Sequence, residues 1–192
     1  MRLGTVMRDG RTQAFKQTAE GTFYLPAADI RALLSIDGWE GLAGERGGAP
    51  EPGDLAPPVT EPRAFVCAGL NYADHAREVG KTAPEFPTLF AKLSHTLIGA
   101  AQPIELPGPE VSAKVDWEAE LVVVIGRRIR NASPAQAHAA ILGYTAMNDV
   151  SMRDWQKRSE EWFQGKNFDR STPVGPVIVT ADEFDVSAGH YV

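Results

Sequence analysis

The stretch Val115–Gly126, with the sequence VDWEAELVVVIG, decides how this chain is interpreted. It alternates between polar and apolar residues at its start and then becomes fully apolar, which predicts a β-strand that enters the core. Residues two apart on a strand share a face, so Asp116, Glu118 and Glu120 are expected to point the same way. The strand therefore carries three carboxylates on one of its faces.

Two explanations fit these carboxylates. If their face is buried, they repel each other and lose hydration, and a hard divalent metal ion with a preference for oxygen ligands would compensate them. If the strand lies at the edge of a sheet, the acidic face is solvated and needs no metal. This stretch alone leaves both explanations open.

Composition narrows the class of protein. The chain has 192 residues, of which 43% are hydrophobic and 23% charged, as in an ordinary globular protein. Its formal net charge is −6, without a long block of basic residues, so we expect neither nucleic acid nor a membrane surface as a partner. Cys67 is the single cysteine, which excludes an internal disulfide and fits a reducing compartment. With no signal-peptide pattern and no apolar run long enough to span a bilayer, we expect a soluble cytoplasmic protein.

The first third of the chain predicts a small separate unit. Short runs typical of strands alternate with turns up to residue 25, and Asp9–Gly10 is a hairpin signal. A helix is expected after Pro26, and the segment 47–62 is so rich in proline and glycine that it predicts a linker. We therefore expect a small N-terminal domain and linker over residues 1–60 and a second domain over residues 61–192.

A short helix is expected in the sequence NYADHAREVG, with Asn71 as its cap and Gly80 at its end. His75 and Glu78 are three residues apart and are neighbours on such a helix. A carboxylate beside an imidazole is the arrangement that a general base needs. An ordinary surface pair has the same spacing, and by spacing alone it is the better explanation.

Several other polar residues lie at places where a site could form. Lys92 interrupts an apolar run, as a snorkelling edge lysine or as a cation aimed into a site. The expected strand GYTAMND delivers Asp149 at its end, where functional side chains are frequent, and Arg153 and Gln156 follow it. Lys166 follows a glycine in an aromatic stretch, but no phosphate-loop pattern surrounds it.

Taken together, these segments resemble the fumarylacetoacetate hydrolase family. The matching stretches lie between residues 63 and 177 and run in the order of the family: CAGLNYADHAREVG, FAKLSHTLIG, VDWEAELVVVIG, GYTAMNDVSMRDWQ and GKNFDRSTPVGP. The resemblance implies an α+β fold built around a mixed β-sandwich roll of the fumarylacetoacetate hydrolase type, preceded here by the small N-terminal unit of strands and helix. It also implies a homodimer.

The resemblance further implies a site with a role for each candidate residue. Its metal, Mg²⁺ or Mn²⁺, would be bound by Glu118, Glu120 and Asp149. His75 and Glu78 match the catalytic dyad of the family on a lid-like helix, and Lys166 matches the lysine that supports a developing oxyanion. The positions that line the substrate pocket are matched by Lys92, Arg153 and Gln156.

Two departures from the family pattern affect the expected function. Many members have an arginine where this chain has Leu70, so one contact to a substrate carboxylate is absent. Members also continue beyond the point where this sequence stops, with further strands and a Thr-Gly-Thr-Pro segment, so the C-terminal part of the usual fold is expected to be missing.

The resemblance implies a metal-dependent hydrolase that cleaves a C–C bond in an acylpyruvate or another 1,3-dicarbonyl compound of aromatic or amino-acid catabolism. The expected partner is a small 2-oxo acid. Two alternatives stay open. One is isomerisation, tautomerisation or decarboxylation of a 2-oxo diacid on the same metal site, and the other is an inactive truncated member of the family.

Overall fold

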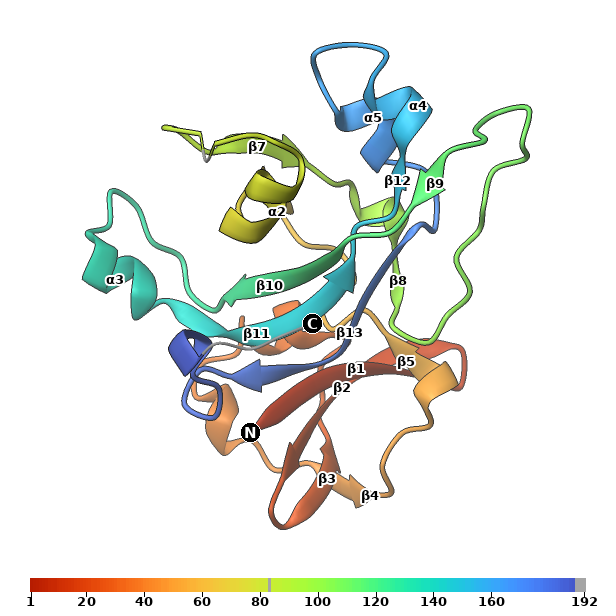
Figure 1. Ribbon diagram of the computed structural model, residues 1–192. Coiled ribbons are helices and arrows are strands. Elements are labelled where there is room, and N and C mark those ends of the chain that lie inside the picture. The colour runs from red at the N-terminus through yellow and green to blue at the C-terminus, as the bar shows by residue number, and fades with distance from the viewer. Residues whose placement is uncertain (83, 189–192) are drawn as a thin grey trace.

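A nine-stranded sheet organises the computed structural model, which describes residues 1–82 and 84–188 (Figure 1). The strands follow one another in the order β10, β11, β13, β1, β2, β3 and β4, with β5 paired to β1 and β8 paired to β13. Their bounds are β10 (Ala119–Ile125), β11 (Ile141–Asn148), β13 (Thr172–Thr180), β1 (Arg2–Arg8), β2 (Arg11–Thr18), β3 (Gly21–Tyr24), β4 (Glu45–Gly47), β5 (Leu55–Ala56) and β8 (Leu97–Gly99).

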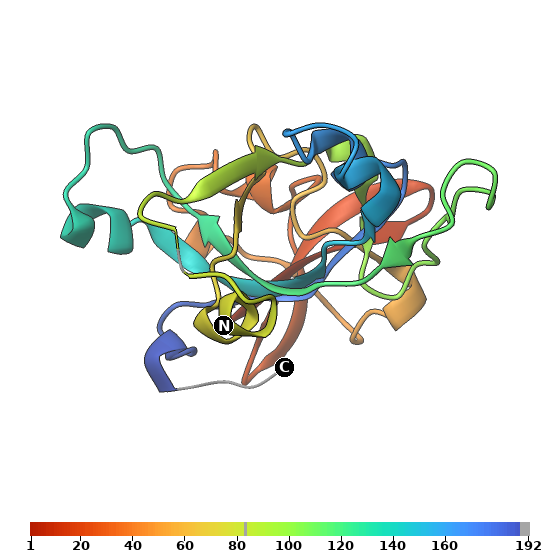
Figure 2. The same ribbon diagram turned by 45° about the horizontal axis from the view of Figure 1, so that its top comes forward.

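Two small sheets and short helices surround this sheet. One small sheet pairs β6 (Val66–Gly69) with β7 (Thr88–Ala91), and the other pairs β9 (Val115–Asp116) with β12 (Ser151–Met152). The helices are α1 (Ile30–Leu33), α2 (Ala73–Glu78), α3 (Pro134–His138), α4 (Arg153–Gln156) and α5 (Phe163–Lys166), and the 3₁₀ turns are η1 (Trp39–Gly41), η2 (Pro52–Asp54), η3 (Ser94–Thr96) and η4 (Val186–Ala188). Figure 2 shows α4 and α5 side by side. Among the described residues, none of the helices has the length and apolar character that crossing a membrane would require.

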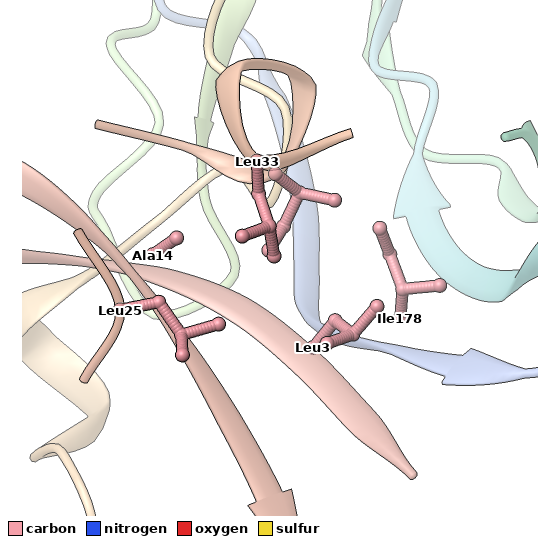
Figure 3. Close-up of a cluster of buried hydrophobic side chains, with 6 residues drawn as sticks. Leu3, Ala14, Leu25, Leu33 and Ile178 are labelled. Carbon is pink, nitrogen blue, oxygen red and sulfur yellow. The ribbon is translucent and has the colours of Figure 1, made fainter. Parts of the chain in front are cut away.

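The N-terminal strands share the main sheet with the rest of the chain. Strand β1 pairs with β2 on one side and with β13 on the other, where Leu3 lies opposite Ile178. A core cluster extends across this junction and is shown in Figure 3: Leu3, Ala14, Leu25, Ile30, Leu33 and Ile178, all fully buried. The sheet and this core are therefore continuous across residue 60, and the division into two domains there stays a prediction.

The acidic stretch is not one continuous strand, so this expectation is wrong. Strand β9 ends at Asp116, and β10 begins at Ala119, with Trp117 and Glu118 between them. The two pieces have different partners, because β9 pairs with β12 and β10 pairs with β11. The break places Asp116 and Glu120 on different strands, with Glu118 between them.

The expected full burial of the apolar half of this stretch is also wrong. Strand β10 lies at the edge of the main sheet, and its residues alternate between half-buried and exposed. Leu121, Val123 and Ile125 are 40%, 46% and 52% exposed, so one face of the strand is open. The opposite face packs against the core through Val122 and Val124.

Candidate active site

Two neighbouring strands deliver the first two carboxylates of the site. Ala119 of β10 lies opposite Asn148 of β11, so Glu118 and Asp149 lie next to each other just outside the paired region. The backbone N–H of Asp149 donates to the carbonyl oxygen of Glu118 at 2.9 Å, and the N–H of Glu118 donates to the side-chain oxygen of Asn148 at 3.1 Å. The expectation that Asp149 follows the end of a strand is confirmed.

Two lysines pair with these carboxylates. The Nζ atom of Lys92 lies 2.6 Å from Oδ1 of Asp149, and the Nζ atom of Lys166 lies 2.8 Å from Oδ2 of Asp149 and 2.7 Å from Oε2 of Glu118. The side chains of Lys92, Asp149 and Lys166 are 0%, 1% and 2% exposed. We refer to Lys92, Glu118, Asp149 and Lys166 as the acid–lysine cluster. Burying such charges requires close pairing, because each loses its hydration.

Burial also affects the protonation of the cluster. It lowers the pKa of Lys92, although the nearby Asp149 carboxylate opposes this effect. The ammonium form of this lysine therefore depends on Asp149. Lys92 directly follows β7, is buried and pairs with Asp149, so it is not a snorkelling edge residue, and its role in a site stays a prediction.

Aromatic side chains cover Lys166, and no pattern in the sequence indicates this contact. The Nζ atom of Lys166 lies 5.2 Å from the ring centroid of Phe90, and this ring packs edge-on against Trp162 with 5.8 Å between centroids. Gly69 makes room for Trp162, because a Cβ atom at this glycine would overlap the indole ring. The apolar rings exclude water from one side of the ammonium group and so strengthen its electrostatic interactions.

Asn167 joins the two chain segments that carry the lysines. Its Oδ1 atom accepts the backbone N–H of Leu93 at 2.7 Å, and its Nδ2 atom donates to the carbonyl oxygens of Ala91 at 2.9 Å and Phe163 at 3.0 Å. These bonds lie on both sides of Lys92 and on the helix that ends at Lys166. The sequence could not reveal the bonds with Ala91 and Leu93, since these partners are about seventy residues from Asn167 in the chain.

Arg153 adjoins the cluster at Glu118. Its Nη1 atom lies 2.6 Å from Oε1 of Glu118 and donates to Oε1 of Gln156 at 2.9 Å, while its Nε atom donates to Oδ2 of Asp116 at 2.9 Å. The hydrogen bond from Arg153 lowers the pKa of Asp116. Of the three predicted substrate-binding residues, Arg153 therefore contacts the predicted metal ligand Glu118, and Gln156 contacts Arg153.

Glu120 lies in β10, two residues after Glu118, and is linked to Tyr72. Burial raises the pKa of Glu120, and the carboxylates of Glu118 and Asp149 raise it further, while a hydrogen bond from Tyr72 opposes the rise. The hydroxyl of Tyr72 also accepts the backbone N–H of Leu121 at 3.1 Å. The sequence did not identify Tyr72, because its partners lie about fifty residues further along the chain.

The predicted dyad lies apart from the cluster. His75 and Glu78 are on α2, with 3.8 Å between Nδ1 and Oε2 and with side chains that are 51% and 81% exposed. Within the part of the chain that the structure describes, no hydrogen bond or ion pair joins either residue to the acid–lysine cluster. The residue that caps the helix is Tyr72, without a side-chain hydrogen bond to the backbone, so the expected Asn71 cap is wrong.

The chemistry of the donors fits a hard divalent cation. Glu118, Glu120 and Asp149 supply only carboxylate oxygens, and the pKa of Glu120 responds to both of the other carboxylates. Among residues 1–82 and 84–188, however, no three acidic, histidine or cysteine side chains are arranged as a ready cation site. The ammonium group of Lys166 lies between Glu118 and Asp149 instead. The three ligands and the identity of the ion stay predictions.

Cys67 is expected to be unreactive in the folded protein. Burial raises the pKa of its thiol to about 12, and the Asp149 carboxylate adds to the rise. At pH 8 the thiol is therefore protonated, and we expect labelling by a disulfide reagent to be at least about a hundredfold slower than in denatured protein. Following thiol release by absorbance checks this, and rapid stoichiometric labelling of the native protein would contradict it.

Gly165 is required for the packing of α5 against α4. A Cβ atom at this position would lie 2.5 Å from the backbone nitrogen of Gln156. We expect Gly165→Ala to displace Lys166 and to lower the free energy of unfolding by about 1–3 kcal/mol, as overpacking does. Thermal unfolding measures this, with Gly53→Ala as the control because nothing lies within 4 Å of a Cβ there. Equal melting temperatures for the two variants would show that α5 tolerates the methyl group.

The main sheet, with the cluster of buried charges at its edge, defines an α+β protein with a candidate site. The chain belongs to the fumarylacetoacetate hydrolase family, since the family model described as Fumarylacetoacetate (FAA) hydrolase C-terminal matches residues 64–190. The predicted family and fold type are confirmed by this match and by the solved structures that the chain resembles.

Curated relatives include tautomerases. The mitochondrial oxaloacetate tautomerase fahd2 of Xenopus laevis is 42% identical over 130 residues, which are 67% of this chain and 40% of that protein. The mitochondrial oxaloacetate tautomerase FAHD2B of Homo sapiens is 41% identical over 170 residues, which are 88% of this chain and 50% of that protein. The chain thus spans half or less of the length of these two relatives.

Solved structures with the same fold include a hydrolase and an isomerase. The fumarylacetoacetate hydrolase from psychrophilic Exiguobacterium antarcticum is 30% identical with a TM-score of 0.78, over 96% of this chain and 68% of that chain. The 5-carboxymethyl-2-hydroxymuconate delta-isomerase from Mycobacterium smegmatis is 31% identical with a TM-score of 0.72, over 97% of this chain and 69% of that chain. The family therefore places more than one reaction on this fold.

Proposed function

We propose that this chain carries the active site of an enzyme that interconverts the keto and enol forms of a small 2-oxo diacid of the oxaloacetate type. The observation that supports this most is the pair of buried ammonium groups on Asp149, at 2.6 Å and 2.8 Å. Tautomerisation passes through an enolate, and preorganised cations in a dry site stabilise the charge that develops on its oxygen. The names of the curated relatives support the same reaction.

Each residue then has a proposed role. Lys166 stabilises the enolate oxygen and Lys92 holds Asp149 in place. Arg153 and Gln156 bind a carboxylate of the substrate, which would replace the contact of the guanidinium group with Asp116 and Glu118. This exchange keeps Arg153 paired with a negative charge both before and after binding.

The proton would be moved by the dyad on α2. His75, oriented by Glu78, removes a proton from the carbon beside the carbonyl group and returns it to the enol. The two side chains are 51% and 81% exposed, so α2 would have to approach the acid–lysine cluster when substrate is bound. Lids that close over a substrate are a general way to complete a catalytic site.

A divalent metal ion is part of the proposal. Glu118, Glu120 and Asp149 would hold Mg²⁺ or Mn²⁺, which when bound supplies a Lewis acid for the 2-oxo group. With the charge of these carboxylates compensated in this way, the ammonium group of Lys166 would turn from Glu118 and Asp149 to the substrate.

Hydrolysis of an acylpyruvate is the second candidate. It is favoured by the name of the matching family model and by the hydrolase from Exiguobacterium antarcticum. Here His75 would deprotonate a water molecule that attacks the distal carbonyl, and Lys166 would stabilise the tetrahedral oxyanion. The two reactions share the cluster and differ in whether a C–C bond breaks.

The test measures both reactions on the same protein. Oxaloacetate is supplied as its enol with and without Mg²⁺ or EDTA, and enol absorbance, exchange of the C3 hydrogens with D₂O, and pyruvate are followed. A tautomerase removes enol absorbance and speeds C3 exchange without forming pyruvate. Formation of pyruvate from oxaloacetate indicates decarboxylation. Formation of pyruvate and a free acid from an acylpyruvate indicates hydrolysis. Either result without faster exchange of the C3 hydrogens would overturn the proposal.

Matched variants show whether the activity depends on the proposed site residues or changes with any substitution. His75→Asn is expected to slow C3 exchange at least about a hundredfold, the typical contribution of a general base. His138→Asn is the control, since His138 lies at the end of α3 and shares no contact with the cluster among the described residues. The double variant Glu118→Ala/Glu120→Ala should remove the effect of Mg²⁺.

The assembly and the cellular location stay predictions. A homodimer is the expected assembly, which sedimentation would measure. The sequence predicts a cytoplasmic location, whereas the names of the two tautomerases place those proteins in mitochondria.

A further inference from the structure

Tyr72 makes two polar contacts with one strand. It directly precedes α2, and its hydroxyl accepts the backbone N–H of Leu121 at 3.1 Å while interacting with the carboxylate of Glu120. A phenolic hydroxyl can donate and accept at the same time, so both of its capacities are used. Residues 120 and 121 belong to β10, the edge strand that follows Glu118.

Helix α2 has few other attachments to the protein. It is six residues long, it has no side-chain cap at its start, and Ala76 is the only buried residue within it. A helix this short is unstable in isolation, so its position depends on tertiary contacts. Figures 1 and 2 show α2 beyond the edge of the main sheet, next to β10.

The edge of β10 explains why the contact forms at this place. The N–H of Leu121 points away from β11, because it donates to Tyr72 and not to the neighbouring strand. An edge N–H group needs a partner other than the sheet. Tyr72 provides this partner and brings the start of α2 with it.

We propose that Tyr72 is a positioning residue that fastens the start of α2 to β10, the strand that carries Glu120 and directly follows Glu118. His75 lies three residues after Tyr72, so about one helical turn separates it from the attachment. The attachment fixes the start of α2 relative to β10. The catalytic part of this inference rests on the proposed function, whereas the attachment itself does not.

The test replaces Tyr72 by phenylalanine, which keeps the ring and removes both polar contacts. The control is Tyr24→Phe, since the hydroxyl of Tyr24 donates to the carbonyl oxygen of Gly48 at 2.9 Å in the N-terminal strands. Hydrogen exchange of the Leu121 amide and of the α2 amides is measured in both variants. In Tyr72→Phe we expect exchange about five- to tenfold faster at these sites, the factor that follows from losing one or two hydrogen bonds.

Kinetics give the second readout. If Tyr72 positions His75, Tyr72→Phe lowers kcat for C3 exchange about tenfold and changes KM little, because substrate still binds to Arg153 and Gln156. Unchanged exchange at Leu121 and α2 would overturn the inference, whatever the kinetics. Faster amide exchange with unchanged kcat would overturn its catalytic part. Absence of turnover in the wild-type protein would count against the proposed function, and the amide exchange would still test the attachment.

Discussion

Asp149→Ala is expected to lower the free energy of unfolding by about 3–5 kcal/mol, a larger loss than that expected for Gly165→Ala. Asp149 is 1% exposed and pairs with Lys92 and Lys166 at 2.6 Å and 2.8 Å. Among the described residues, its removal leaves Lys92 buried without a paired carboxylate, and Lys166 keeps only its pair with Glu118. Uncompensated buried charge is among the few causes of large destabilisation.

Urea unfolding measures the effect, and Asp169→Ala is the matched control. Asp169 lies in an exposed turn three residues after Lys166, and no ion pair to it is seen in the described part of the chain. The control should stay within about 0.5 kcal/mol of wild type. A loss below about 1 kcal/mol in Asp149→Ala would mean that the cluster is hydrated or rearranges, in conflict with the burial of its side chains.

Lys166→Met is expected to have the largest effect on activity, a loss of about 10²- to 10³-fold in kcat. Methionine is similar in length to lysine and can pack against Phe90, so the protein should remain folded. What is lost is the ammonium group that, in the proposed function, stabilises the enolate oxygen. Asp149 retains Lys92 as a partner, and Glu118 retains Arg153.

The control for this substitution is Lys157→Met, which removes a charge at an exposed position directly after α4. Rates and circular dichroism are measured for both variants. A folded Lys166→Met protein with wild-type kcat would show that the lysine only compensates Glu118 and Asp149. A higher KM with an unchanged kcat would assign Lys166 to substrate binding.

Local patterns in the sequence predicted the first hairpin and the position of Asp149. The hairpin at Asp9–Gly10 and the placement of Asp149 at the end of a strand depend on neighbouring residues, and both are found in the structure. The family resemblance then grouped Lys92 and Lys166 with the acidic residues, which no spacing rule could do. The structure brings these residues together.

The features that sequence could not predict depend on distant partners. The interruption at Trp117 arises because β9 and β10 pair with different strands. The contact of Tyr72 with β10 and the bonds from Asn167 to Ala91 and Leu93 join segments about fifty to seventy residues apart. Side-chain chemistry at such sites gives no local periodicity, so only the folded chain reveals it.

The bonds made by Asn167 have a consequence for how this site can diverge during evolution. At Ala91 and Leu93 they are made to backbone atoms, which every residue except proline possesses in full. Mutations can therefore change the side chains on both sides of Lys92 without releasing the segment that holds it. Natural variation can reshape the surroundings of this lysine while the charged centre stays in place, which under the proposed function would change the choice of substrate.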